Sequence, residues 1–282
     1  MKIKVFFLCL LINVSFTFAE ELHLFRFESL SDFVDVFTGN DLPVYESYMN
    51  ILNRQNIKQQ KIFLVRDNRK EYFERNYSRE GFLVSEISHV HDENQYFYVY
   101  DDNNNIIKSG DFTYKYLDSA TREVYFRNEL QKKESFVVSN DKVNITVIYY
   151  SFTTSDNALF ESSKRFYEYQ LQGKKIKKFT SENYNRLGKL SFNPREIIFE
   201  YNEQGNILQI IDSYGSDDIR SVRNFLYKDD QLVEICIENF TKGNPNSIIT
   251  FSEFDKNGNY LLYKEVWSSG KIVSARREFQ YY

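Results

Sequence analysis

The chain has little cysteine, proline, glycine or histidine: Cys 2, Pro 3, Gly 10 and His 3 among 282 residues. Cys9 lies in an apolar N-terminal run, so loss of that run leaves only Cys236 and excludes an intramolecular disulfide or a zinc ribbon. We expect Cys236 to be a buried small hydrophobe in a strand. Neither a phosphate-binding glycine loop nor a G-x-S-x-G nucleophile elbow occurs, which argues against nucleotide chemistry and serine hydrolysis.

The chain also lacks a large excess of charge of either sign. Lys+Arg is 36 and Asp+Glu is 40, a formal net charge of -4. A mildly acidic chain without a basic block lacks the electrostatic footprint of a nucleic-acid binder and the polybasic patch of a lipid-surface protein. We therefore expect no nucleic-acid partner. An envelope protein or polysaccharide is the expected kind of partner, and the oligomeric state is left open.

The N-terminus has the pattern of a secretory signal peptide. Lys2 and Lys4 precede an apolar run over 5–16, and Thr17-Phe18-Ala19 places small residues for cleavage before Glu20. The run spans about 12 residues, short for a membrane helix, although an uncleaved anchor is the alternative. We predict a signal peptide over 1–19 and an extracytoplasmic location: periplasm, cell surface or secreted. No later segment has the length and apolarity of a transmembrane helix.

Aromatic residues are plentiful, with Tyr 22 and Phe 26, and they favour strands. Polar and apolar residues alternate around Val143–Tyr149, Ile197–Tyr201 and Val233–Ile237, the pattern of half-buried antiparallel strands. Helical spacing occurs only early, over 29–39 and 41–52, before a strand-like segment at 61–65. We predict a mixed α/β region over 20–95 and a β-hairpin repeat domain over 96–282.

Polar turns recur at a fixed spacing in the C-terminal half. The aromatic residues before them, Tyr201, Tyr227, Phe254 and Tyr281, are spaced by about 26–27 residues, as in a stacked repeat. The predicted fold class is mainly β, an antiparallel meander of β-hairpin repeats with this period and a small mixed α/β N-terminal part. The strands should reverse at Gly205, Gln231 and Gly258.

These turns carry a family resemblance. Phe199-x-Tyr201-Asn202-x-x-Gly205-Asn206-Ile207 and Phe254-Asp255-x-x-Gly258-Asn259-Tyr260 resemble the YD/RHS-like repeats of bacterial secreted proteins, and also variant MORN repeats, over about residues 165–282. The resemblance implies a β-hairpin array with a binding, shell or structural role. It implies no catalytic residues.

One arrangement could bind a metal. His89 and His91 would point to the same face of a strand, and Asp92 or Glu93 could add an oxygen ligand. The alternative is a polar strand end leading into a turn. A site needs three or four ligands, and the remaining ones are undetermined. We name His89 and His91 as candidate metal ligands and predict no catalytic residues and no other cofactor.

Exposed aromatic residues are the other functional candidate. Tyr, Phe and Trp267 on a sheet surface could stack on sugar rings or grip a peptide strand, whereas the alternative is that they fill the core. The predicted function is an exported, non-enzymatic binding or structural protein of the bacterial cell envelope. The second hypothesis is an envelope-polymer hydrolase, assisted by a metal at His89 and His91.

Overall fold

Every helix or strand in the part of the chain that the structure describes is a β-strand. This computed structural model describes residues 56–66, 69–88, 94–103, 105–139, 141–152, 158–172, 175–215, 218–229 and 231–282. The predicted signal peptide and the helices predicted over 29–39 and 41–52 lie outside these residues. None of the described segments is a helix of the length and apolarity needed to cross a membrane.

The chain divides into two compact units, and β-strands build both. Unit 1 comprises residues 1–45 and 99–194, and unit 2 comprises residues 46–98 and 195–282. The strands of unit 2 are β1 (Ile57–Arg66), β2 (Arg69–Tyr77), β3 (Leu83–Ser88), β4 (Asn94–Tyr100), β12 (Arg195–Tyr201), β13 (Ile207–Tyr214), β14 (Ile219–Lys228), β15 (Gln231–Asn239), β16 (Ser247–Phe254), β17 (Tyr260–Trp267) and β18 (Ile272–Tyr281).

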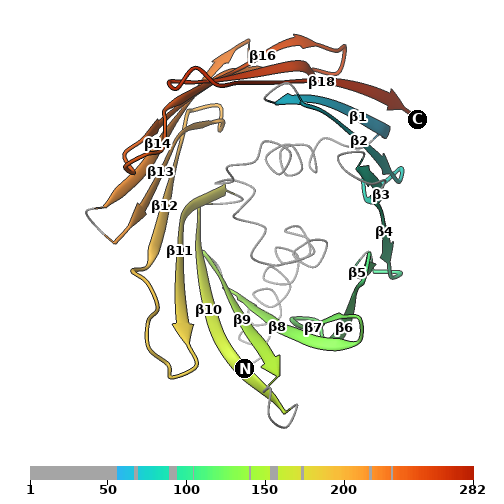
Figure 1. The fold of residues 1–282 in the computed structure, drawn as a ribbon, viewed down its shortest axis with the longest axis vertical. Helices are drawn as coiled ribbons and strands as arrows, with labels where there is room; N and C mark the ends of the chain where they lie inside the picture. Colours follow the sequence, from blue (N-terminus) through green and yellow to red (C-terminus); the bar gives the residue numbers. More distant parts are fainter. Residues whose placement is uncertain are drawn as a thin grey trace, which may run out of the picture. The chain divides into compact units, whose positions relative to one another are not determined.

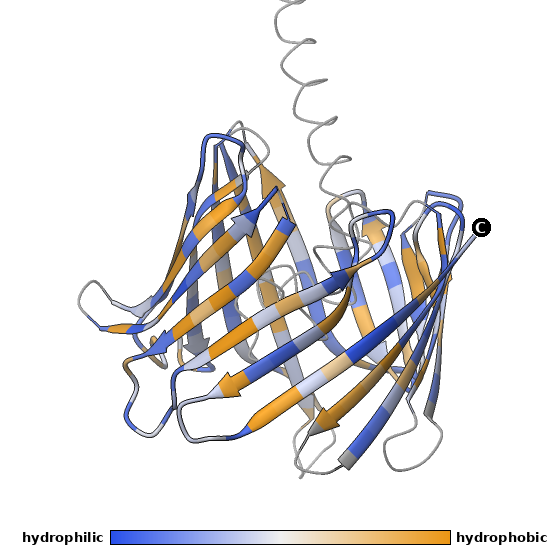
Figure 2. Ribbon diagram, turned by 90° about the horizontal axis from the view of Figure 1, so that it is seen from above, coloured by the Kyte–Doolittle hydropathy of each residue, from blue (hydrophilic) through white to orange (hydrophobic). Residues whose placement is uncertain are grey.

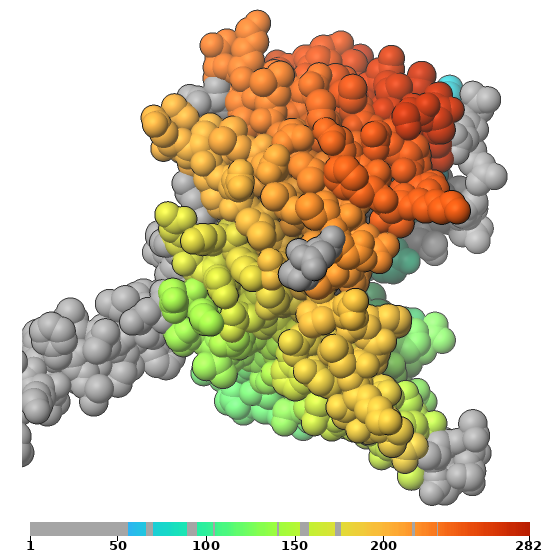
Figure 3. Space-filling view, turned by 90° about the vertical axis from the view of Figure 1, so that its left-hand side faces the viewer, coloured from blue at the N-terminus to red at the C-terminus, as the bar shows by residue number. Residues whose placement is uncertain are grey.

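The sheet of unit 2 is an antiparallel meander joined through its first and last strands. β12 to β18 pair in chain order, β1 pairs with both β18 and β2, and β2, β3 and β4 continue the sheet. Neighbouring C-terminal strands, coloured orange to red, lie side by side on the face shown in Figure 3. The segment predicted as a strand at 61–65 lies within β1, which confirms that prediction.

Unit 1 is a second antiparallel meander. Its strands are β5 (Ile106–Ser109), β6 (Phe112–Asp118), β7 (Thr121–Phe126), β8 (Glu129–Val138), β9 (Lys142–Phe152), β10 (Leu159–Gln172) and β11 (Lys175–Asn185). Each pairs with the next strand in the chain, as Figure 1 shows for β8 to β11.

The predicted meander is therefore confirmed, and strands reverse at the three predicted turns. β12 ends at Tyr201 and β13 begins at Ile207, β14 ends at Lys228 and β15 begins at Gln231, and β16 ends at Phe254 and β17 begins at Tyr260. A small mixed α/β part is not seen, because the described residues of 20–95 belong to β1–β4 and their turns. The division at 1–19, 20–95 and 96–282 stays a prediction.

Two of the longer turns share one hydrogen-bonding scheme. The Asp255 carboxylate accepts bonds from the backbone N–H groups of Asn257 and Asn259, at 2.8 and 2.9 Å, and the Asp101 carboxylate does the same for the N–H groups two and four residues later. Gly258 has φ 81°, a conformation that glycine adopts without steric cost. Local side-chain chemistry thus fixes these reversals.

Alternation gives each sheet one buried and one exposed face. In β1, Ile62 and Leu64 are buried, whereas Phe63 and Val65, which alternate with them, are exposed. Hydrophilic and hydrophobic residues alternate along individual strands in Figure 2. The buried face is mostly aliphatic and aromatic, so burial of this face stabilises the sheets.

Candidate binding surface

The exposed face of β1, β2 and β3 carries a continuous set of polar and aromatic side chains, which we call the β1–β2 patch. All of it lies in unit 2. In β1 and β2 the members alternate with mostly buried residues, and the cross-strand register places them next to one another, whereas Ser85 of β3 is itself buried beside Asn76. The β1–β2 patch consists of Gln59, Lys61, Phe63, Tyr72, Glu74, Asn76 and Ser85.

Two aromatic rings form one side of the patch. Phe63 pairs directly with Tyr72 across β1 and β2. Their ring centroids lie 5.0 Å apart with an interplanar angle of 31°, and the Phe63 side chain is 39% exposed. Two adjacent, tilted rings that remain partly accessible to solvent provide an apolar surface.

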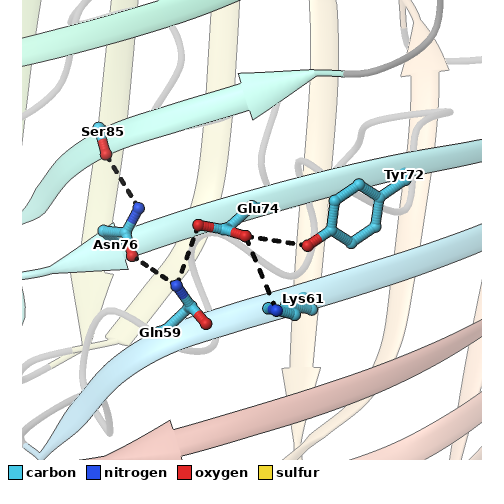
Figure 4. Close-up of polar contacts among 6 residues, drawn as sticks. All are labelled: Gln59, Lys61, Tyr72, Glu74, Asn76 and Ser85. Atoms are coloured by element: carbon cyan, nitrogen blue, oxygen red, sulfur yellow. Dashed lines mark hydrogen bonds and ion pairs between the residues drawn. The ribbon is translucent and has the colours of Figure 1, made fainter.

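Hydrogen-bonding groups form the other side of the patch (Figure 4). The Gln59 amide donates to Glu74 Oε1 and to Asn76 Oδ1, both at 3.0 Å, and the Asn76 amide donates to Ser85 Oγ at 3.1 Å. Lys61 Nζ lies 3.9 Å from Glu74 Oε2. These contacts hold planar amide and carboxylate groups in fixed orientations beside the rings.

The Tyr72 hydroxyl connects the two sides. It donates a hydrogen bond of 2.9 Å to Glu74 Oε2. Burial, this hydrogen bond and the negative charges of Glu74 and Glu278 raise the pKa of Tyr72 to about 12. The phenol therefore stays protonated and remains a donor at neutral pH.

The charges on and around the patch balance. Lys61 pairs in register with Glu74 on one side and with Glu278 of β18 on the other, and Phe63 pairs with Arg276. Two cations thus face two carboxylates. Charged side chains therefore lie in the middle of these strands, on the same face as the aromatic rings.

The backbone under the patch is already paired. β1 forms ladders with both β2 and β18, and β2 forms ladders with both β1 and β3. A peptide that binds by strand addition needs an unpaired edge. The patch can therefore bind a ligand only through its side chains.

Buried charged groups with defined partners occur in the sheet of unit 1. In unit 1, Arg122 Nε lies 2.7 Å from Glu134 Oε2, and Lys132 Nζ lies 2.8 Å from Glu134 Oε1. Burial alone raises the pKa of Glu134, but the charges of Arg122 and Lys132 outweigh this effect and hold it below its usual value. Paired in this way, the cluster stabilises a particular packing of β7 and β8.

The structure does not describe the residues proposed for metal binding. His89 and His91, with Asp92 and Glu93, lie outside the described residues, so that site stays a prediction. Among the residues that the structure describes, no group of three or more His, Cys, Asp or Glu side chains is arranged to hold a metal ion.

The structure shows how far Cys236 and Trp267 are buried. Cys236 is half-exposed and its Sγ lies 3.3 Å from Glu234 Oε1, so the prediction of a buried thiol is wrong. The reason is alternation, which buries Ile235 of the same strand and turns Cys236 to the opposite face. Trp267 is half-buried, with Lys271 Nζ 5.5 Å from its ring centroid.

Sequence reasoning did not single out Phe63, Tyr72 and Glu74. A signal existed, since Gln59, Lys61 and Phe63 occupy alternate positions in one strand and Tyr72-x-Glu74 places two partners on one face of the next. What was missing was the assignment of Ile62 and Leu64 to the buried side.

Comparisons with known proteins identify no family for this chain. No family model matches its sequence, and no curated protein matches it either. Among solved structures, it is similar to a porin-like protein from Bacteroides uniformis (10% identity, 79% of this chain and 96% of that chain, TM-score 0.30). A porin-like protein from Bacteroides vulgatus gives 9% identity, 79% and 98% coverage and a TM-score of 0.33.

A third similar structure is the Tc holotoxin pore of Photorhabdus luminescens, at 9% identity and a TM-score of 0.28. The match covers 72% of this chain but only 14% of that one. With TM-scores this low, the function must be argued from the chain's own residues.

Proposed function

We propose that this chain is an exported, non-enzymatic protein of the cell envelope that binds an uncharged polysaccharide on the β1–β2 patch. In this proposal residues 1–19 direct export, and the hairpins are an array of the YD/RHS-like kind that presents a binding face. The ligand class is a flat, β-1,4-linked glycan. The observation that carries the proposal is the exposed Phe63–Tyr72 ring pair beside fixed amide and carboxylate groups.

The chemistry of the patch matches that of a sugar. A pyranose ring has an apolar C–H face that packs on an aromatic ring, and hydroxyl groups at its edge that both donate and accept hydrogen bonds. Phe63 and Tyr72 supply the apolar platform, and Gln59, Glu74 and Asn76 supply donors and acceptors beside it.

The ligand should be uncharged. Lys61 and Arg276 offset Glu74 and Glu278, so the patch has no net charge to select an anion or a cation. A peptide ligand is less well matched, because the backbone of β1 and β2 has no free edge to pair with it.

The second candidate, a metal-assisted hydrolase, depends on His89 and His91. No observation on the described residues favours it.

Affinity electrophoresis tests the proposal. The protein should be retarded in gels that contain hydroxyethyl cellulose or glycol chitin, which are uncharged β-1,4-linked polymers. Phe63→Ala should weaken binding about fivefold at this patch, because a stacked ring contributes on the order of 1 kcal/mol.

Leu226→Ala is the matched control. Leu226 is 55% exposed on β14, a strand of the same unit that carries no part of the patch, and its loss should leave retardation unchanged. Migration that is the same with and without both polymers would contradict the proposed function.

A further inference from the structure

Unit 1 carries a second surface with the same components. It lies on the exposed face of β9, β10 and β11, where the register places its members next to one another. This surface, which we call the β10–β11 patch, consists of Lys142, Phe166, Glu168, Gln170, Glu182 and Tyr184.

The second patch has the same two ring types as the first, but its rings meet edge to face, at an interplanar angle of 83° instead of 31°. Phe166 and Tyr184 lie on neighbouring strands with ring centroids 5.5 Å apart, and Phe166 is 40% exposed. The Tyr184 hydroxyl donates to Glu182 Oε2 at 2.7 Å, and this hydrogen bond raises the pKa of Tyr184. In both patches an exposed Phe contacts a Tyr whose hydroxyl bonds to a Glu two residues away.

The polar part repeats as well. Lys142 Nζ donates to both oxygens of Glu168 at 3.1 and 3.2 Å, and the Gln170 amide donates to Glu168 Oε1 at 3.0 Å. The Gln170 hydrogen bond, with the charge and hydrogen bond of Lys142, lowers the pKa of Glu168. The first patch has the same Lys–Glu–Gln arrangement around Glu74.

The two patches also differ in how their carboxylates are used. In the β1–β2 patch Glu74 accepts from both the tyrosine and the glutamine. In the β10–β11 patch Glu182 accepts from Tyr184, whereas Glu168 serves the lysine and glutamine. Phe166 pairs with Glu182 in the register, and Glu168 lies two residues along the same strand, so both carboxylates adjoin the exposed ring.

We infer that the β10–β11 patch is a second binding site for the same class of ligand, an uncharged β-1,4-linked glycan. This inference rests on the proposed function. It makes the chain bivalent, with one glycan site in each unit.

Isothermal titration with chitohexaose and cellohexaose, two uncharged β-1,4-linked hexasaccharides, counts the sites. The wild-type chain should bind two molecules of one of these probes. Phe166→Ala and Tyr184→Ala should each weaken one of the two sites about fivefold and leave the other site unchanged. Phe63→Ala should weaken the other site by a similar factor, and the double variant Phe63→Ala, Phe166→Ala should weaken both.

Tyr125→Ala provides the matched control. Tyr125 donates to Glu123 at 2.6 Å, as Tyr184 does to Glu182, but none of the described ring contacts includes it. This variant should retain two sites. Since loss of a ring could also unfold unit 1, amide hydrogen exchange of the wild-type chain with saturating hexasaccharide gives an independent readout, and β10 and β11 should gain protection.

The outcomes separate the inference from the proposed function. A wild-type stoichiometry of one, at a site that Phe63→Ala weakens, with no added protection in β10 and β11, would overturn the second site and leave the first intact. Absence of binding by either hexasaccharide would overturn both.

Discussion

Arg122 and Glu134 form an ion pair with 2.7 Å between Nε and Oε2, and neither side chain is exposed. Glu134→Ala would leave the Arg122 and Lys132 cations without this carboxylate. We expect it to lower the free energy of unfolding by about 3–5 kcal/mol, measured by urea denaturation.

Glu161→Ala is the control for this prediction, because Glu161 pairs with Lys164 at 2.9 Å on an exposed surface. Its loss should change the free energy of unfolding by less than about 1 kcal/mol. Equal effects of the two substitutions would contradict the structural role of the buried pair.

The same pair predicts a pH dependence. The pKa of Glu134 in the folded chain lies below its ordinary value of 4.5. Its contribution to stability is therefore fully present above the ordinary pKa and is lost as the pH falls through the lower, folded-state pKa. The thermal stability of the wild-type chain should therefore fall steeply below about pH 4.5, and it should fall further than that of Glu134→Gln. Parallel pH profiles of the two proteins would contradict a role of Glu134 in the loss of stability at low pH.

Gly258 offers a test of the turn chemistry. At φ 81° its backbone is in the left-handed region. Gly258→Ala should cost about 1–2 kcal/mol of unfolding free energy, and Gly258→Asn should cost less because asparagine tolerates this conformation. Lys256→Ala, in the same turn, should be nearly neutral. If the alanine variants at 256 and 258 were equally stable, the turn would not require glycine.

Tyr281 tests the link between the end of β18 and the turn that joins β16 to β17. Its hydroxyl donates a hydrogen bond to Asp255 and accepts one from the Asn259 amide at 2.9 Å. Tyr281→Phe should therefore lower the free energy of unfolding by about 1 kcal/mol. Tyr282→Phe, which removes a hydroxyl that bonds to the Tyr77 carbonyl, should be compared in the same denaturation series.

The turns could be predicted from the sequence because their chemistry is local. Asp255, Asn257 and Asn259 satisfy one another's hydrogen bonds within five residues, and the aromatic residue before each turn marks the strand end. Alternation within a strand was also visible, and it explains why β1 was correctly expected at 61–65.

The candidate site could not be predicted, for two physical reasons. Pairing of β1 with β18 joins the two ends of the described chain, a contact that no local pattern encodes. Alternation also leaves open which face is exposed, so Phe63 was not separated from Ile62, and Cys236 was assigned to the wrong side of β15.

The central claim is that the exposed Phe63–Tyr72 pair binds an uncharged glycan. Isothermal titration of the wild-type chain and of Phe63→Ala with chitohexaose and cellohexaose tests it most directly. The wild-type chain should bind at least one hexasaccharide, and Phe63→Ala should weaken one site about fivefold while its thermal unfolding stays unchanged. Identical titrations of the two proteins, or no heat of binding from either, would contradict the claim.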